Sequence, residues 1–167
     1  MEKALRGKIS LQKITAVGLL VALGVVAAPL SLPVGAARVF PVQHAINVIA
    51  GATLGPWWAV VAALLTSTIR NLMGWGTLLA YPGSIFGAFL AGFLFSLFKH
   101  KIWAALGELL GTGFIGAVVA FPVARWLLDS PVLAYTFIVP FSLSSIAGIM
   151  IGLILLTLLE KSGYLKL

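Results

Sequence analysis

Six apolar stretches alternate with short polar or proline-containing segments along the chain. They predict helices at residues 13–30, 42–54, 56–73, 81–98, 102–127 and 133–159. A helix needs about 20 predominantly apolar residues to cross a bilayer, so most of these stretches are long enough, although the second is short. No strand pattern competes with helices, and the alternation typical of a membrane barrel is absent. We therefore expect an all-α membrane protein, with six transmembrane helices in a compact bundle and residues 1–167 as a single domain.

Prolines interrupt the chain between the first two predicted helices. Pro29, Pro33 and Pro41 each lack a backbone donor, so this segment is expected to be a loop that folds back over the protein. Pro56 suits the first turn of the third helix. The basic start and apolar run of residues 1–28 also resemble a secretory signal peptide. Because the rest of the chain is equally membrane-like, we interpret that run as the first span.

The composition supports a location in the membrane. Of 167 residues, 61% are hydrophobic and 9% are charged. A soluble domain has about 25% charged residues. The composition therefore excludes an ordinary soluble domain, a disordered segment and a surface nucleic-acid binder. The formal net charge of +7 is better explained by topology, because basic residues hold loops on the cytoplasmic side of a membrane.

The basic residues divide unevenly between the two sides of a six-span bundle. With an even number of spans, both termini lie on one side. That side holds eight basic residues: Lys3, Arg6, Lys8, Lys13, Lys99, Lys101, Lys161 and Lys166. The other side holds three: Arg38, Arg70 and Arg125. The excess of basic residues predicts that both termini are cytoplasmic.

Few side chains are available for catalysis or for binding a metal. The chain has no cysteine, two histidines and four carboxylates. It also lacks the Gly-x-x-x-x-Gly-Lys-Ser/Thr loop that cradles nucleotide phosphates, so we do not expect it to hydrolyse ATP by that mechanism. We predict no metal, no cofactor and no catalytic residue. Glu108 is the one carboxylate placed inside a predicted span, where either a functional role or a structural hydrogen-bonding role is open.

Polar and aromatic side chains gather at the predicted outer ends of the second, third and fourth helices. They are Gln43, His44, Asn47, Arg70, Asn71, Trp75, Tyr81 and Ser84. Gln43 and Asn47 are four residues apart and share a helix face. Mostly apolar walls with a few placed polar groups are typical of a small-molecule pocket. Hydrogen bonding between helices, and an Arg70 side chain that reaches the lipid headgroups, would explain the same residues.

Small residues recur four positions apart in most of the predicted helices. The pairs are Gly18/Ala22, Gly24/Ala28, Gly51/Gly55, Gly83/Gly87, Gly107/Gly111 and Gly148/Gly152. Such spacing lets helix backbones approach closely in lipid. Packing within the bundle explains most of these pairs. In the first helix, contact with another membrane protein is an equal alternative.

Four stretches of the chain together resemble one family. They are residues 42–51 (VQHAINVIAG), 54–59 (LGPWWA), 69–72 (IRNL) and 76–84 (GTLLAYPGS). The chain is similar in these stretches to the ThiW family, the substrate-binding (S) components of energy-coupling factor (ECF) vitamin transporters. The resemblance covers nearly the whole chain. It implies a bacterial or archaeal cytoplasmic membrane protein that works with a transmembrane coupling protein and two cytoplasmic ATPases.

The resemblance also implies a ligand and its place. The ligand would be a thiamine precursor of the hydroxyethyl-methylthiazole type, bound under the loops between helices 1 and 2 and between helices 3 and 4. Phe40, Trp75 or Tyr81 would stack on the ring, and His44, Asn47, Asn71 or Ser84 would bind the hydroxyl group, with Gln43 and Arg70 nearby. Arg70 suits an anionic ligand, or an anchor for the loop, better than a neutral ligand.

The family's contact with the coupling protein is less complete here. Many S components carry an Ala-x-x-x-Ala motif in helix 1, and the nearest equivalent is Gly18-x-x-x-Ala22. Three other functions stay open. The same scaffold would suit another small vitamin or heterocycle, such as hydroxymethylpyrimidine or thiamine. A membrane enzyme using His44 or Glu108, and a purely structural subunit, are more remote alternatives.

Overall fold

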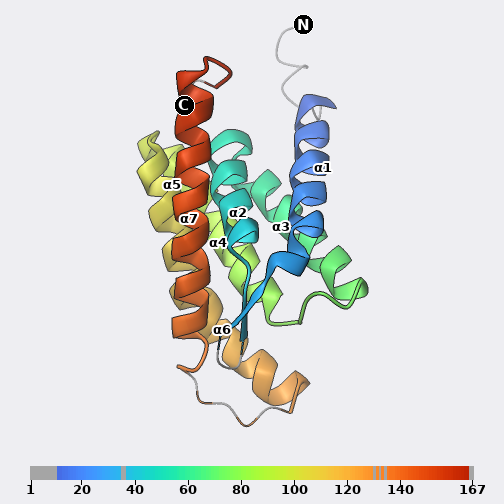
Figure 1. The fold of residues 1–167 in the computed structure, drawn as a ribbon. Coiled ribbons are helices and arrows are strands. Elements are labelled where there is room, and N and C mark those ends of the chain that lie inside the picture. The colour runs from blue at the N-terminus through green and yellow to red at the C-terminus, as the bar shows by residue number, and fades with distance from the viewer. Residues whose placement is uncertain (1–10, 35–36, 130, 132, 134, 166–167) are drawn as a thin grey trace, which may run out of the picture.

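Helices packed side by side form a bundle (Figure 1). The computed structural model describes residues 11–34, 37–129, 131, 133 and 135–165. Five helices are α1 (Leu11–Val26), α2 (Pro41–Leu54), α3 (Pro56–Leu72), α4 (Ala80–Phe98) and α7 (Ile138–Lys161). A further continuous rod consists of α5 (Lys101–Glu108), a π-helical turn (Leu109–Gly116), α6 (Ala117–Pro122) and a second π-helical turn (Val123–Leu127). The six predicted helices are therefore present, and we call the composite helix the α5–α6 rod.

In the described part of the chain, three helices are long and apolar enough to cross a bilayer. They are α4 with 19 residues, the α5–α6 rod with 27 and α7 with 24. The helix α1 is a shorter apolar helix of 16 residues. The fold is thus an all-α membrane bundle, as the hydropathy pattern predicts. The last helix begins at Ile138 rather than near residue 133, which places Pro140 in the first helical turn, where its missing N–H leaves no bond unmade.

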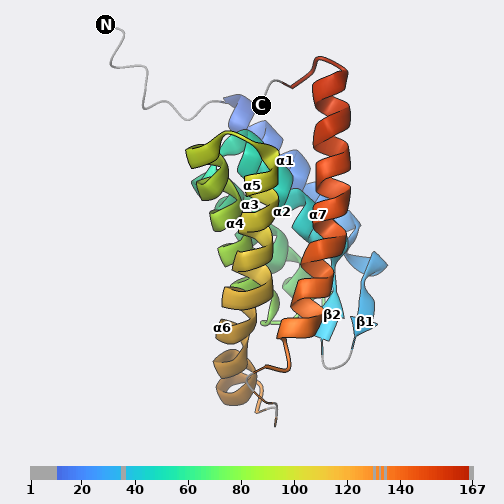
Figure 2. The ribbon, with the colours of Figure 1, turned by 90° about the vertical axis from the view of Figure 1, so that its left-hand side faces the viewer.

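The loop between α1 and α2 contains strands, which the sequence pattern did not predict. Strands β1 (Leu32–Val34) and β2 (Ala37–Val39) pair antiparallel, with Leu32 opposite Val39 and Pro33 opposite Arg38. A short 3₁₀ turn, Ala28–Leu30, precedes them. The hairpin folds back beside α7 (Figure 2), so the predicted direction of this loop is confirmed while its assumed lack of strands is wrong. Three-residue strands are too short to leave a periodic pattern in the sequence.

Glycines make the closest helix crossings. A Cβ atom at Gly107 or Gly111 would collide with backbone atoms of α4, and one at Gly148 would collide with the Pro41 carbonyl oxygen at the start of α2. These crossings confirm that small residues serve packing inside the bundle. Gly18 of α1 differs, because no atom of the described residues lies within 4 Å of the position that its Cβ would take.

Different helix ends and loops lie at the two ends of the bundle. One end contains the start of α1, the end of α4, the start of α5 and the end of α7 (Figures 1 and 2). The Lys101 ammonium forms an ion pair with Glu160 at this end. The opposite end contains the β1–β2 hairpin and the segment that leads into α4, and we call it the hairpin end. The end that faces the cytoplasm stays a prediction from the charge distribution.

Candidate functional site

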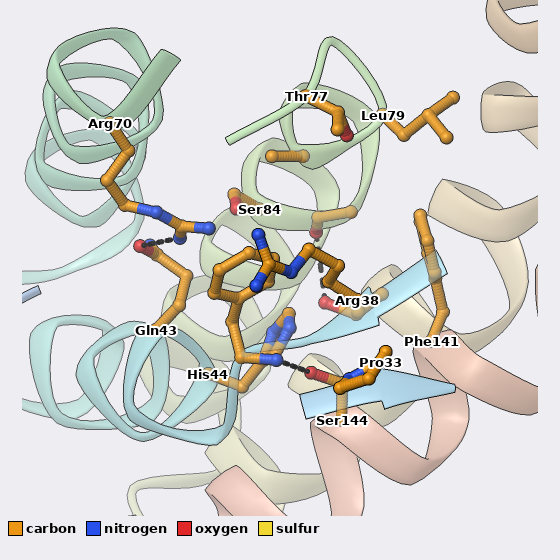
Figure 3. A pocket seen from close by; sticks show the side chains of 14 residues that line it. Pro33, Arg38, Gln43, His44, Arg70, Thr77, Leu79, Ser84, Phe141 and Ser144 are labelled. Atoms are coloured by element: carbon orange, nitrogen blue, oxygen red, sulfur yellow. Dashed lines mark hydrogen bonds between the residues drawn. The ribbon is translucent and has the colours of Figure 1, made fainter. Parts of the chain in front are cut away.

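A cavity of about 340 Å³ opens at the hairpin end (Figure 3). Its size lies at the lower end of the range usual for small-molecule sites, which suits a ligand with a single ring. Seven parts of the chain line it: the hairpin, α2, α3, the segment between α3 and α4, the start of α4, the α5–α6 rod and α7. The lining residues are Pro33, Arg38, Phe40, Gln43, His44, Arg70, Thr77, Leu79, Ala80, Gly83, Ser84, Thr112, Phe141 and Ser144.

The helix α2 supplies polar side chains that line or support this cavity. Pro41 occupies its first turn, where a proline fits without loss of a helical hydrogen bond. Because α2 packs against α3, α4 and α7, both its polar and apolar side chains are buried. Gln43, His44 and Asn47 are all less than 10% exposed. Buried polar groups of this kind need partners, and each of the three has them.

A chain of hydrogen bonds runs from an arginine to a carboxylate through two amides of α2. Arg70 Nη1 donates to Gln43 Oε1 over 3.2 Å, and Gln43 Nε2 donates to Asn47 Oδ1 over 3.3 Å. Asn47 Nδ2 then donates to Glu108 Oε1, also over 3.3 Å. The chain links α3, α2 and the α5–α6 rod. Its two charged ends are consistent with the direction of every bond, because the cation only donates and an ionised carboxylate only accepts.

Glu108 also fixes the imidazole of His44. Its Oε1 atom lies 2.6 Å from His44 Nδ1, and its side chain is fully buried. When the carboxylate is ionised it cannot donate, so Nδ1 carries the hydrogen, and Nε2 of a neutral imidazole is then an acceptor. His44 lines the cavity, which makes this second ring nitrogen the candidate contact for a ligand hydroxyl group. Glu108 thus acts as a positioning residue beneath the cavity.

Thr112 and Gly87 complete the surroundings of the carboxylate. Thr112 Oγ1 lies 2.7 Å from Glu108 Oε1 and 2.9 Å from the Gly83 carbonyl oxygen, and its single hydrogen serves one of these acceptors at a time. A Cβ atom at Gly87 would collide with Thr112 Oγ1 and with the Glu108 carboxylate. The missing side chain at Gly87 therefore makes room for the buried acid between α4 and the rod.

The structure separates the nine predicted ligand-binding residues into two groups. Phe40, Gln43, His44, Arg70 and Ser84 line the cavity. Asn47, Asn71, Trp75 and Tyr81 are not among the lining residues.

Each of these four has other neighbours. Both amide hydrogens of Asn47 are used, one by Glu108 and one by the Ser84 carbonyl oxygen over 3.4 Å. The Tyr81 hydroxyl donates to Thr68 Oγ1 over 3.1 Å. The Asn71 side chain lies against Gly76, and the backbone of Trp75 donates to the Arg70 carbonyl oxygen.

Two arginines reach the cavity from different elements. The Arg70 side chain of α3 is 1% exposed, and its Cζ atom lies 3.7 Å from the centre of the Phe40 ring. The Arg38 side chain comes from β2 and is exposed. Both guanidinium groups point toward the middle of the cavity (Figure 3). Sequence reasoning placed Arg38 in the correct loop but did not include it in the site.

Other lining residues were missed because their types are ordinary in a membrane protein. Leu79 and Phe141 are apolar side chains among many, so the sequence offers no signal for them. Ser144 is one of several serines in the last predicted helix, and its Oγ atom accepts the Phe40 N–H over 2.8 Å, which ties the start of α2 to α7. Thr112 lies four residues after Glu108 and so on the same helix face, a signal that could have identified it.

The fold and the cavity define the class of protein. It is an α-helical, multi-pass membrane protein with a small-molecule cavity near one end of the bundle. In the part of the chain that the structure describes, no group of three histidine or acidic residues is placed to hold a metal ion. The sequence matches the ThiW family, described as thiamine-precursor transporter protein, over residues 14–162, and the chain therefore belongs to this family. No curated protein and no solved structure gives a match.

Proposed function

We propose that this protein is the substrate-binding S component of an ECF transporter and imports a thiamine precursor of the hydroxyethyl-methylthiazole type. The family membership supports a thiamine-precursor transporter. The cavity supports a small ligand with one ring, bound close to the hairpin end. The observation that carries the proposal is the His44–Glu108 pair, because it gives one imidazole a fixed orientation in a cavity whose other walls combine apolar, hydroxyl, amide and arginine side chains.

The proposed ligand would use the cavity as follows. Its hydroxyl group donates to His44 Nε2, whose orientation Glu108 holds. Its ring lies among Pro33, Leu79 and Phe141, which supply apolar and aromatic surface. One side of the Phe40 ring is already occupied by Arg70, so we assign ring stacking to Phe141. The hydroxyl of Ser84 remains a further polar contact within the cavity.

The proposed partners would meet the protein outside this cavity. Gly18 and Ala22 are exposed on α1, and this face would be the contact surface for a transmembrane coupling protein. Two cytoplasmic ATPases would complete the transporter in a bacterial or archaeal cytoplasmic membrane. We favour binding over catalysis for the His44–Glu108 pair, because among the described residues no hydroxyl nucleophile is hydrogen-bonded to His44.

Calorimetric titration of the purified protein without ATP tests this proposal. The ligands are hydroxyethyl-methylthiazole, the aminopyrimidine precursor and thiamine, and we expect the thiazole to bind most tightly. The variant His44→Asn should weaken thiazole binding about fivefold, the equivalent of roughly 1 kcal/mol for one hydrogen bond. His100→Asn is the matched control, because His100 is exposed and caps α5 through a side-chain acceptor that Asn also offers. Absence of binding by all three compounds would refute the proposed function.

A further inference from the structure

We propose that the ligand of this cavity carries an anionic group and that Arg38 and Arg70 bind it. The group is either a carboxylate on the thiazole ring, which leaves the hydroxyl group free to bind His44, or a phosphate monoester, which replaces that hydroxyl group and its bond to His44. This inference rests on the proposed function and narrows its substrate. It follows from the hydrogen-bond donors that Arg70 leaves unused and from the charges that face the cavity.

Arg70 has more donors than the protein satisfies. Its guanidinium is almost fully buried, yet only Nη1 has an acceptor, the Gln43 side chain. Nε and Nη2 have no hydrogen-bond partner among the residues that the structure describes. A buried donor without a partner is costly, and a buried charge more so. The fork of a guanidinium matches two oxygens of a carboxylate or phosphate, which would satisfy such donors together.

Arg38 adds a second positive charge to the same space. The two guanidinium groups point toward each other across the cavity, so their charges repel (Figure 3). Among the described residues, no carboxylate forms an ion pair with either arginine, and no side chain accepts a hydrogen bond from Arg38. A role for Arg70 in holding Gln43 and Phe40 would explain one arginine. It would not explain why Arg38 faces the same cavity.

Among the described residues, Glu108 is the only acidic residue near this site, and its single negative charge does not balance both arginines. Its Oε1 atom already forms hydrogen bonds with His44 and Asn47. It is connected to Arg70 only indirectly, through the side chains of Gln43 and Asn47. With His44 neutral, two arginines and one glutamate leave one uncompensated positive charge around the cavity. An anionic substituent supplies the missing charge, whereas a neutral alcohol does not.

Three compounds with the same ring separate the possibilities. They are hydroxyethyl-methylthiazole, its phosphate monoester and the thiazole bearing a ring carboxylate, with inorganic phosphate alone as a fourth titrant. Titration of the full chain in lipid nanodiscs should show that at least one anionic derivative binds about tenfold more tightly than the alcohol. That factor corresponds to one charge-assisted hydrogen bond. The two anionic compounds identify which group the site prefers.

Variants of the arginines test whether they cause the preference. Arg38→Gln should reduce the preference for the anionic compound about tenfold, and Arg70→Gln should reduce it at least as much. Arg125→Gln is the matched control, because Arg125 is exposed near the same end of the bundle and does not line the cavity. Arg38 is exposed, so its variant should fold even if Arg70→Gln does not. Raised salt should also weaken the Arg38 contribution.

The outcomes are distinct. If the alcohol binds as tightly as both anionic compounds, or if Arg38→Gln and Arg70→Gln leave the preference unchanged, this inference is overturned while the proposed function stands. Binding of inorganic phosphate as tightly as the phosphate monoester would also overturn it, since the ring would then contribute nothing. If no thiazole compound binds, the proposed function fails and this inference fails with it.

Discussion

The buried carboxylate of Glu108 gives the sharpest prediction about stability. Glu108→Gln keeps the shape of the side chain but replaces the anion by a neutral amide. The bonds from His44, Asn47 and Thr112 would lose their charge assistance, which is worth roughly 1 kcal/mol in the strongest of them. The new NH₂ group would stand where Oε2 now lies, buried and without a partner, at a cost of about 1–3 kcal/mol.

The sum for Glu108→Gln is a loss of about 2–4 kcal/mol. In a chain of this size each kcal/mol lowers Tm by about 2–4 °C, so thermal unfolding in detergent should shift down by about 4–16 °C. The variant should also weaken ligand binding, because the imidazole of His44 would be free to take either tautomer.

Glu160→Gln is the matched control for this prediction. It removes the ion pair with Lys101, which is partly exposed at the opposite end of the bundle, and such pairs contribute about 0–1 kcal/mol. Its effect on Tm should therefore be small. If Glu108→Gln lowers Tm no further than Glu160→Gln does, the hydrogen-bond chain does not stabilise the bundle and our account of Glu108 is wrong.

Three further predictions concern packing, the hairpin and the limits of the site. Gly107→Leu should prevent folding, because the larger side chain would separate α4 from the rod. Gly18→Leu should leave Tm unchanged but reduce copurification with a coupling protein. Equal effects of the two variants on Tm would contradict the packing argument. Ser144→Ala should leave the Phe40 N–H unpaired at a cost of about 1–3 kcal/mol and speed hydrogen exchange in the hairpin, measured by mass spectrometry; unchanged exchange would refute that role. Tyr81→Phe should bind ligand with unchanged affinity in calorimetry, because the Tyr81 hydroxyl points to Thr68 rather than into the cavity; weaker binding would place it in the site.

The helices were predictable because membrane spans need little more than length and apolar composition. The boundaries of α2 and α3 follow from Pro41 and Pro56, each of which occupies a first helical turn. The β1–β2 hairpin was not predictable. Its strands of three residues are held by pairing with each other and by packing against α7, and neither contact leaves a local pattern. The sequence therefore indicates where this loop begins and ends but not its conformation.

The candidate site was predictable only where polar residues stand out from an apolar background. His44, Arg70 and Ser84 were identified on that basis, and all three line the cavity. The same reasoning could not separate residues that face the cavity from those that support it, so Asn47 was grouped with the ligand contacts although both its amide hydrogens bond within the protein. Trp75 was chosen for its aromatic character and is not among the lining residues.

The position of α2 has a consequence for how the protein is assembled in the membrane. With 14 residues, the helix is about 21 Å long, shorter than the roughly 30 Å of the hydrocarbon layer. Its polar side chains make insertion on its own unfavourable, because nothing in lipid would satisfy them. Two of its neighbours, α3 and α4, follow it closely in the chain, but α7 is synthesised after all the other described helices. The polar face of α2 therefore stays incompletely covered until α7 has been made, and the cavity is complete only when α7 packs against α2.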